Sequence, residues 1–157
     1  PNHSGGTITR GDDYAFFDSA SSIIGQNEGT VYVNAKNLNE AQLLLINRST
    51  TNSLCIFSAQ NSVRFFVFNN TVVHSYNSGV SSIDEFKAVI KYDSSAVKFF
   101  INGSLVQTYS AWDLATPLVD LRLNDRPYIT NPGLSELQQI LLLPNALSDA
   151  DCIALTS

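Results

Sequence analysis

Two polar segments in the C-terminal half of the chain combine aromatic rings with planar hydrogen-bonding groups. The first, residues 109–113, holds the only tryptophan, and the second, residues 124–132, is stiffened by two prolines. An aromatic ring can carry the apolar face of a sugar, while aspartate, asparagine and arginine side chains bond to its hydroxyl groups. The two segments predict a carbohydrate-binding site with six candidate residues: Tyr109, Trp112, Asp113, Asp125, Arg126 and Tyr128.

These side chains also admit structural interpretations, which the sequence leaves open. Trp112 could cover the end of a sandwich of sheets, and Arg126 could pair with Asp125 or Asp113. Both segments flank residues 118–123, so they are either neighbours or lie at opposite ends of one strand.

The residues that hydrolases need do not stand in a catalytic pattern. A glycosidase places two carboxylates across the scissile bond, but Asp84 and Glu85 are adjacent and would face opposite sides of a strand. No Gly-x-Ser-x-Gly motif is present, and His74, between Val72 and Tyr76, is predicted to be a packed sheet histidine. We therefore expect no enzymatic activity.

Composition narrows the class of protein. With 157 residues, 44% of them hydrophobic and 15% charged, the chain is expected to form one domain, residues 1–157. The net charge is −5 and the nine lysines and arginines are scattered, which argues against nucleic-acid binding. No run approaches the roughly 20 apolar residues of a membrane helix, so no membrane insertion is expected.

The start of the chain and its cysteines allow three further expectations. Residues 1–7 are expected to be flexible, and the chain, which begins at Pro1 and lacks methionine, is expected to be a fragment of a longer protein. Cys55 and Cys152 both lie in apolar surroundings and are predicted to be buried free thiols, with a disulfide left open.

The stretch from Val97 to Tyr109 is typical of a β-hairpin, because Asn102 and Gly103 suit the positive φ angles of a type I′ turn. Counting outward from this turn predicts three cross-strand pairs: Ile101 with Ser104, Phe99 with Val106, and Val97 with Thr108. The opposite face would then be more apolar than a solvated face usually is, because it would hold Lys98, Phe100, Leu105, Gln107 and Tyr109.

The remaining elements are short strands with alternating apolar residues. They are predicted over residues 30–36, 42–47, 54–58, 63–68, 71–76, 85–93, 118–124 and 137–143. In 118–124 the apolar side, predicted to face inward, holds Val119, Leu121 and Leu123, and 137–143 is predicted to be a buried last strand. The pair 63–68 and 71–76 has one face with Val63, Phe65, Val67, Val72, His74 and Tyr76, and another with Arg64, Phe66, Phe68, Thr71, Val73 and Ser75. Since neither face is clearly polar, these strands are expected to be central or covered by another layer.

Only residues 147–155 are predicted to be helical. Ser148 can accept a hydrogen bond from the backbone of Asp151, and Leu147 and Cys152 stand where a hydrophobic staple would join them. The whole pattern predicts an all-β fold, an antiparallel sandwich or jelly roll with a short C-terminal helix.

Three stretches resemble the laminin-G/concanavalin A-like jelly roll of lectins and glucanases. They are the strand Phe86 to Tyr92, the hairpin Val97 to Tyr109, and Ile140 to Asp151, where a last strand runs into a short helix. Asp151 replaces the glutamate usual in the family, a conservative departure. The resemblance implies that Asp120, Asn124 and Asp125 could hold a calcium ion at the rim of the sandwich. The same residues also fit ordinary roles in a turn. No other cofactor is expected.

The N-terminal residues look like the version of this domain found in bacteriophage tail fibre and tailspike proteins. The matching stretches are Ile8 to Asp13 and Ile24 to Tyr32. The resemblance implies a non-catalytic, lectin-like receptor-binding module of the virion that attaches to a host-cell surface polysaccharide, within a parent fibre that is a homotrimer. One alternative is a structural domain that caps or trimerises the fibre and binds no sugar. A second is a domain appended to a polysaccharide depolymerase whose catalytic part lies elsewhere in the chain.

Overall fold

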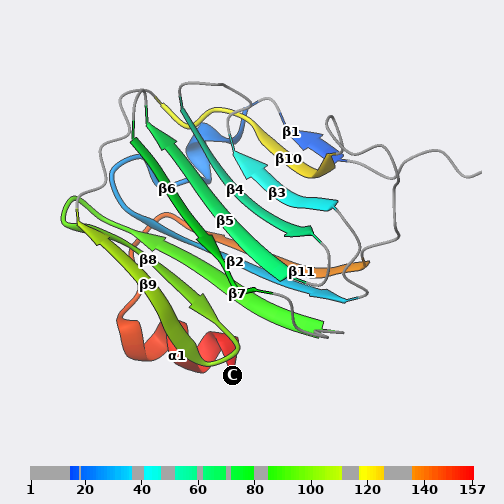
Figure 1. Ribbon diagram of the computed structural model, residues 1–157. Helices are drawn as coiled ribbons and strands as arrows, with labels where there is room; N and C mark the ends of the chain where they lie inside the picture. Colours follow the sequence, from blue (N-terminus) through cyan, green and yellow to red (C-terminus); the bar gives the residue numbers. More distant parts are fainter. Residues whose placement is uncertain are drawn as a thin grey trace, which may run out of the picture.

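Two antiparallel β-sheets stack face to face, and one helix lies against the outside of the second sheet (Figure 1). The computed structural model describes residues 15–17, 19–36, 41–46, 52–59, 62–69, 72–79, 85–110, 117–125 and 136–157. The first sheet has the strand order β1-β10-β3-β4-β5-β6, and the second has the order β11-β2-β7-β8-β9. This arrangement confirms the predicted antiparallel sandwich with a short C-terminal helix.

The strands agree with the predicted segments to within a few residues. The first sheet contains β1 (Ala15–Phe17), β3 (Ala41–Ile46), β4 (Asn52–Ala59), β5 (Ser62–Asn69), β6 (Val72–Asn77) and β10 (Leu121–Asp125). The second contains β2 (Gly29–Lys36), β7 (Glu85–Tyr92), β8 (Ala96–Ile101), β9 (Ser104–Ser110) and β11 (Glu136–Leu143). Strand β1 and the short 3-10 helix η1 (Ala20–Ser22) were not predicted.

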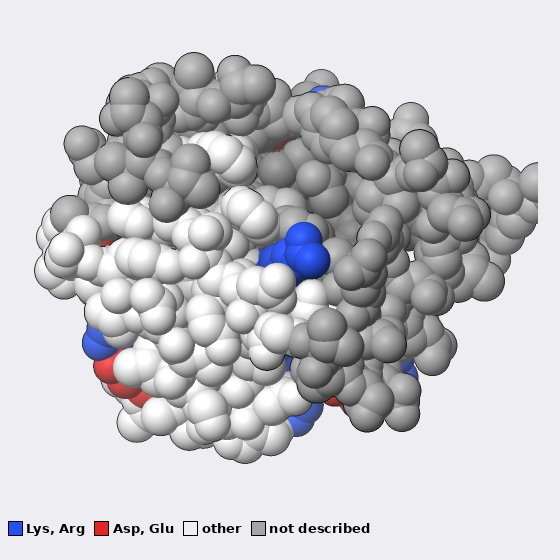
Figure 2. Space-filling view, viewed as in Figure 1, with Lys and Arg blue, Asp and Glu red and all other residues white. Residues whose placement is uncertain are grey.

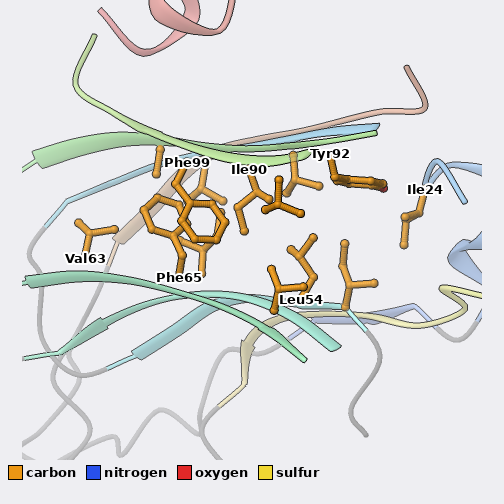
Figure 3. Packing of buried hydrophobic residues seen from close by; sticks show 14 of the residues in the cluster. Ile24, Leu54, Val63, Phe65, Ile90, Tyr92 and Phe99 are labelled. Atoms are coloured by element: carbon orange, nitrogen blue, oxygen red, sulfur yellow. The ribbon is translucent and has the colours of Figure 1, made fainter. Parts of the chain in front are cut away.

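The core fills the space between the sheets (Figure 3). The rings of Phe65 and Phe99, from opposite sheets, stack with centroids 4.6 Å apart. Tyr92 is fully buried, and its hydroxyl donates a hydrogen bond of 2.6 Å to the Gly25 carbonyl. Gly29 is required beside it, because a Cβ there would lie 2.4 Å from the Tyr92 hydroxyl oxygen. Burying these rings supplies much of the free energy that holds the sheets together.

Helix α1 (Asp149–Thr156) lies on the outer face of the second sheet. Cys152 packs there against Tyr32, Val89 and Phe100, with Leu147 at the edge of the cluster, as the staple pattern predicted. Ser148 accepts the expected hydrogen bond from the Asp151 backbone at 3.1 Å. The helix therefore covers one outer face of the sandwich.

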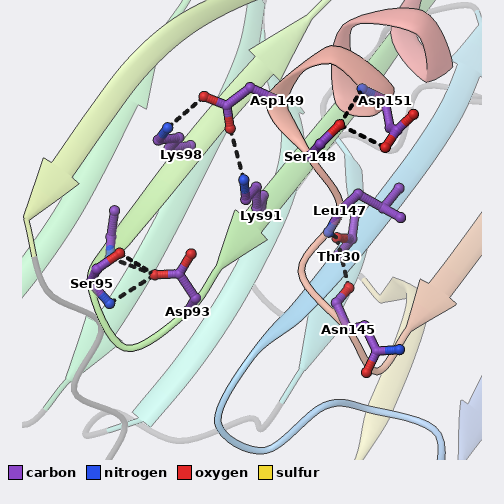
Figure 4. A network of polar contacts seen from close by, with 11 residues as sticks. Thr30, Lys91, Asp93, Ser95, Lys98, Asn145, Leu147, Ser148, Asp149 and Asp151 are labelled. Atoms are coloured by element: carbon purple, nitrogen blue, oxygen red, sulfur yellow. Dashed lines mark hydrogen bonds and ion pairs between the residues drawn. The ribbon is translucent and has the colours of Figure 1, made fainter.

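Polar contacts fix the start of this helix (Figure 4). The Asp149 carboxylate forms ion pairs with Lys91 Nζ at 2.8 Å and with Lys98 Nζ at 2.5 Å. Their hydrogen bonds and charges hold the pKa of Asp149 below its ordinary value. Thr30 Oγ1 anchors the preceding turn, since it donates to the Asn145 carbonyl and accepts from the Leu147 backbone, both at 3.0 Å.

The central hairpin forms around the predicted turn, but its register differs. Asn102 and Gly103 have φ angles of 45° and 76°, as a type I′ turn requires. Ile101 does pair with Ser104, whereas Phe99 pairs with Gln107 and Val97 with Tyr109. A register irregularity at Phe99/Phe100 shifts the pairing by one residue, so Tyr109 faces the core side, contrary to the predicted face.

Two strand predictions need correction. Val119, predicted to face inward, lies outside β10 and is 43% exposed. The backbone here is bonded to the N-terminal part of the chain rather than to a neighbouring strand, because Leu118 N–H donates to the Gln26 side chain and the Val119 carbonyl accepts from Ala20 of η1. The last strand, predicted to be buried, is the edge strand β11, and its apolar residues are half-buried.

The free-thiol prediction is confirmed, since Cys55 and Cys152 are both buried and unpaired with each other. They lie on different parts of the sandwich: Cys55 is on the first sheet, and Cys152 is on the side of helix α1 that packs against the second sheet. Among the described residues, no helix is long and apolar enough to span a membrane. The predicted flexibility of residues 1–7 concerns a segment outside the described residues.

Candidate functional site

The outward side chains of β5 and β6 form a mixed aromatic and polar surface. Val63, Phe65 and Val67 of β5 are buried in the core, so the alternating residues between them face away from it. Cross-strand pairing places Asn77 beside Arg64 and Ser75 beside Phe66. This surface, called the β5–β6 face below, consists of Arg64, Phe66, Phe68, Ser75 and Asn77.

Charge is sparse around this surface. Across strands β3, β4, β5 and β6, Arg64 is the one aspartate, glutamate, lysine or arginine. Figure 2 shows a basic side chain near the middle of this view, next to white, uncharged side chains. Strands β3 to β6 therefore supply no carboxylate that would compete with an anionic ligand of Arg64.

The geometry of the face suits a flat, hydroxyl-rich ligand. The Phe66 and Phe68 rings are nearly parallel, with centroids 6.0 Å apart and an angle of 12°, and both are half-buried. Ser75 and Asn77 are exposed beside them. Asn77 Oδ1 accepts from the Gly79 backbone at 3.0 Å, which orients the amide and leaves its nitrogen as a donor. An apolar platform thus adjoins a hydroxyl, an amide and a guanidinium.

Tyr109, one of the predicted sugar-binding residues, supports this face from beneath. Its ring stacks on His74 of β6 with centroids 4.5 Å apart and meets Phe99 edge-on at 5.7 Å. Its hydroxyl donates to the Ser75 carbonyl, which joins β9 to β6 across the edges of the two sheets. His74 is half-buried in this contact, which confirms the prediction of a packed sheet histidine.

Of the predicted site residues other than Tyr109, the structure describes only the backbone of Asp125. Trp112, Asp113, Arg126 and Tyr128 lie outside the described residues. The backbone of Asp125 ends β10, paired with Gln42. In the sequence, residues 111–116 precede the described stretch 117–125 and residues 126–135 follow it. A site formed by these loops stays a prediction.

The predicted calcium ligands are described only in part. Asp120 Oδ2 lies 3.8 Å from Arg122 Nη2, and the side chains of Asn124 and Asp125 are outside the description. Within the described ranges, no three histidine, cysteine, aspartate or glutamate residues gather closely enough to hold a metal ion. Calcium binding at this rim stays untested.

Carboxylates elsewhere in the described structure make structural contacts. Glu85 pairs with Lys36 at 3.3 Å, and the Asp93 carboxylate accepts from the backbone and hydroxyl of Ser95 at 2.7 and 2.5 Å. These hydrogen bonds hold the pKa of Asp93 below its ordinary value. Burial raises the pKa of the Cys55 thiol, and it raises that of Cys152 to about 11, so both remain protonated at neutral pH.

Sequence reasoning assigned Arg64, Phe66 and Phe68 to one strand face but did not select them as a site. The signal was the sequence Arg-x-Phe-x-Phe, in which period-2 spacing puts one cation and two aromatic rings on the same side of a strand. Asn77 fell just beyond the predicted strand 71–76 and could be placed beside Arg64 only once the register of β5 and β6 was known.

Solved structures of binding domains share this fold. The CBM40 domain of the Ruminococcus gnavus IT-sialidase, bound to α2,3-sialyllactose, matches with a TM-score of 0.67 and 18% identity, covering 88% of this chain and 87% of that chain. The receptor-binding domain of botulinum neurotoxin mosaic serotype C/D matches with a TM-score of 0.67 and 14% identity, covering 90% of this chain and 38% of that chain.

The binding domain of botulinum neurotoxin DC in complex with rat synaptotagmin II also matches, with a TM-score of 0.65, 14% identity, and coverage of 94% of this chain and 40% of that chain. No protein-family model and no curated protein matches the chain. At these identities, the likeness shows a shared jelly-roll β-sandwich fold.

Proposed function

We propose that this chain is a non-catalytic carbohydrate-binding module whose ligand lies on the β5–β6 face. The observation that carries the proposal is the combination of two parallel phenylalanine rings with the exposed Ser75 and Asn77 on one sheet face. Such a surface can bind the apolar side of a sugar ring and its hydroxyl groups together. The opposite outer face of the sandwich is occupied by α1, which leaves it less room for a ligand.

The fold comparisons support this proposal. One matched domain is a carbohydrate-binding module bound to sialyllactose, and others are receptor-binding domains of neurotoxins. A binding role, without catalysis, agrees with the structural contacts made by Glu85, Asp93 and Asp149.

The resemblance to tail fibre and tailspike domains supplies the proposed setting. We place the module in a phage virion, outside the cell, where it attaches to a bacterial surface polysaccharide. A homotrimeric parent fibre would present three copies, and multivalent attachment would compensate for weak binding at each site.

The test is binding of the isolated domain to an array of bacterial surface polysaccharides, with and without calcium. Phe66→Ala is expected to weaken binding to any glycan that the domain selects, whereas Trp112→Ala tests the loop site predicted from sequence. Selective binding lost with Phe66→Ala supports the β5–β6 face. Binding lost with Trp112→Ala and unchanged by Phe66→Ala would move the site to the loops.

Exposed apolar residues favour a structural domain as the second candidate function. Phe17, Ile23 and Val119 are 50%, 47% and 43% exposed. They belong to one neighbourhood, because Phe17 pairs with Leu121 and the Ala20 backbone donates to the Val119 carbonyl at 2.8 Å. Such a patch suits contact with another chain of a fibre. Sedimentation of the wild type and Phe17→Asp tests it: self-association abolished by the substitution, without glycan binding, would favour this role.

A further inference from the structure

The surroundings of Arg64 indicate the chemical class of the ligand. We infer, on the basis of the proposed carbohydrate-binding function, that the glycan is acidic and that its carboxylate lies against the Arg64 guanidinium. The proposal is a cation-anchored site in which β5 supplies both the charge and the aromatic platform. It makes Arg64 the residue that separates acidic from neutral sugars.

The first support is the electrostatic setting of this side chain. Arg64 is half-buried, and strands β3 to β6 contain no aspartate or glutamate. A partly buried cation interacts more strongly with an anion than a fully solvated cation does. The planar guanidinium also matches the geometry of a carboxylate. Its five N–H groups can donate hydrogen bonds to a ligand in addition to the contacts that Arg64 makes within the protein.

The second support is the location of the acidic residues. The chain carries a net charge of −5, which by itself opposes an acidic ligand. Most described acidic residues nevertheless lie away from β5: Glu28, Glu85, Asp93 and Glu136 are on or beside strands of the second sheet, and Asp149 and Asp151 are on the helix. In the first sheet, Asp125 ends β10 and Asp120 directly precedes it, and β10 is three strands away from β5. Attraction at Arg64 is therefore local, and screening by salt limits repulsion from charges farther away than about 10 Å.

The neighbours of Arg64 complete a set of contacts for one sugar. Asn77 is its cross-strand partner and Phe66 follows two residues along the same face of β5. Directly opposed side chains on neighbouring strands have Cβ atoms about 5 Å apart, and alternate residues on a strand are about 7 Å apart. A sugar whose carboxylate meets Arg64 can thus place hydroxyl groups near Asn77 and an apolar face over Phe66.

The experiment measures binding of the folded domain to each polysaccharide selected on the array, in its native form and after chemical reduction of its carboxyl groups to alcohols. Sialyllactose and lactose provide a second matched pair, because only the former bears a carboxylate. The variants are Arg64→Gln, Arg64→Lys and the control Arg122→Gln. Arg122 belongs to the same sheet but stands three strands away, at a distance of about 14 Å.

Arg64→Gln is expected to weaken binding of the acidic glycan about 10- to 100-fold, the usual value of a charge-assisted hydrogen bond. Carboxyl reduction should weaken wild-type binding to a similar extent and abolish the difference between wild type and variant. Arg64→Lys should recover part of the affinity, because lysine keeps the charge without the bidentate geometry. Arg122→Gln should change affinity less than threefold.

Two results would overturn the inference while leaving the proposed function intact. One is equal binding of native and carboxyl-reduced glycans. The other is an Arg64→Gln variant that weakens both forms alike and lowers the free energy of unfolding, which would make Arg64 a structural residue. Absence of binding to every polysaccharide would refute the proposed function and the inference with it.

Discussion

Substitution of Tyr109 separates a supporting role in the sandwich from direct contact with a ligand. Tyr109→Phe removes a single hydrogen bond, from the hydroxyl to the Ser75 carbonyl. Because water can reach this edge and replace the lost donor, the free energy of unfolding should fall by about 0.5–1 kcal/mol, the low end for a hydrogen bond. Glycan affinity should change less than twofold, since the ring still supports β6.

Tyr109→Ala has a larger effect because it also removes the ring. The lost contacts are the stack on His74 at 4.5 Å and the edge contact with Phe99 at 5.7 Å. Two aromatic pairs contribute about 1–3 kcal/mol beyond area burial, so with the half-buried ring we expect a loss of about 2–4 kcal/mol. Loosening of β6 beneath Ser75 and Asn77 should then weaken glycan binding as well.

The assay is urea unfolding followed by circular dichroism, combined with binding to the glycan that the wild type selects. The reasoning is refuted if Tyr109→Phe lowers affinity tenfold without changing stability, because the hydroxyl would then contact the ligand directly. Unchanged stability and unchanged affinity would instead show that the bond to Ser75 contributes nothing.

Three further substitutions test the framework by urea unfolding. Tyr92→Phe should cost about 1–3 kcal/mol, because the buried Gly25 carbonyl loses its donor; a cost below 0.5 kcal/mol would contradict the contact. Since the pKa of Asp149 is lowered in the folded protein, its contribution is present above its ordinary pKa and is lost as the pH falls through the folded value. Asp149→Asn should therefore cost up to about 1 kcal/mol at pH 7 and progressively less at lower pH, whereas a constant difference would exclude the ion pairs as its source. Gly103→Ala should destabilise the hairpin by about 1 kcal/mol, since φ is 76° and a Cβ would meet Ser157 Oγ at 3.0 Å; an unchanged unfolding midpoint would show that the turn tolerates the strain.

Local chemistry explains which parts of the fold were predictable from sequence. The Asn102-Gly103 turn and the Ser148 cap depend on residues within a few positions of each other, and both form as expected. The pairing beyond Phe99 was wrong because the register irregularity arises from contacts between strands, which a residue count from the turn does not include. Strand β1 has three residues, too few to show a period.

The candidate site illustrates a different limit. Tryptophan, tyrosine and arginine in polar loops attract attention as sugar-binding residues, so sequence reasoning selected Trp112 and Arg126. The β5–β6 face was harder to select because phenylalanines on a strand usually indicate core. Only the pairing of Arg64 with Asn77, and the presence of Phe65 on the core side, shows that Phe66 and Phe68 face outward. Which face of a two-sided apolar strand meets the ligand depends on tertiary packing.

The layered architecture supports the proposal that a ligand binds to the first sheet. Helix α1 occupies the outer face of the second sheet through Cys152 and the ion pairs of Asp149, so that face contributes to stability. The first sheet buries Phe65 inward and has Arg64, Phe66 and Phe68 on its outer side, and Tyr109 joins its edge strand β6 to β9. A single guanidinium and two rings form a small site, for which weak affinity is expected. In the proposed fibre, several copies would raise the overall avidity by increasing the effective concentration of sites rather than by adding contacts within one site. Arg64 would then determine which glycan is bound, and the assembly would determine how tightly the fibre attaches.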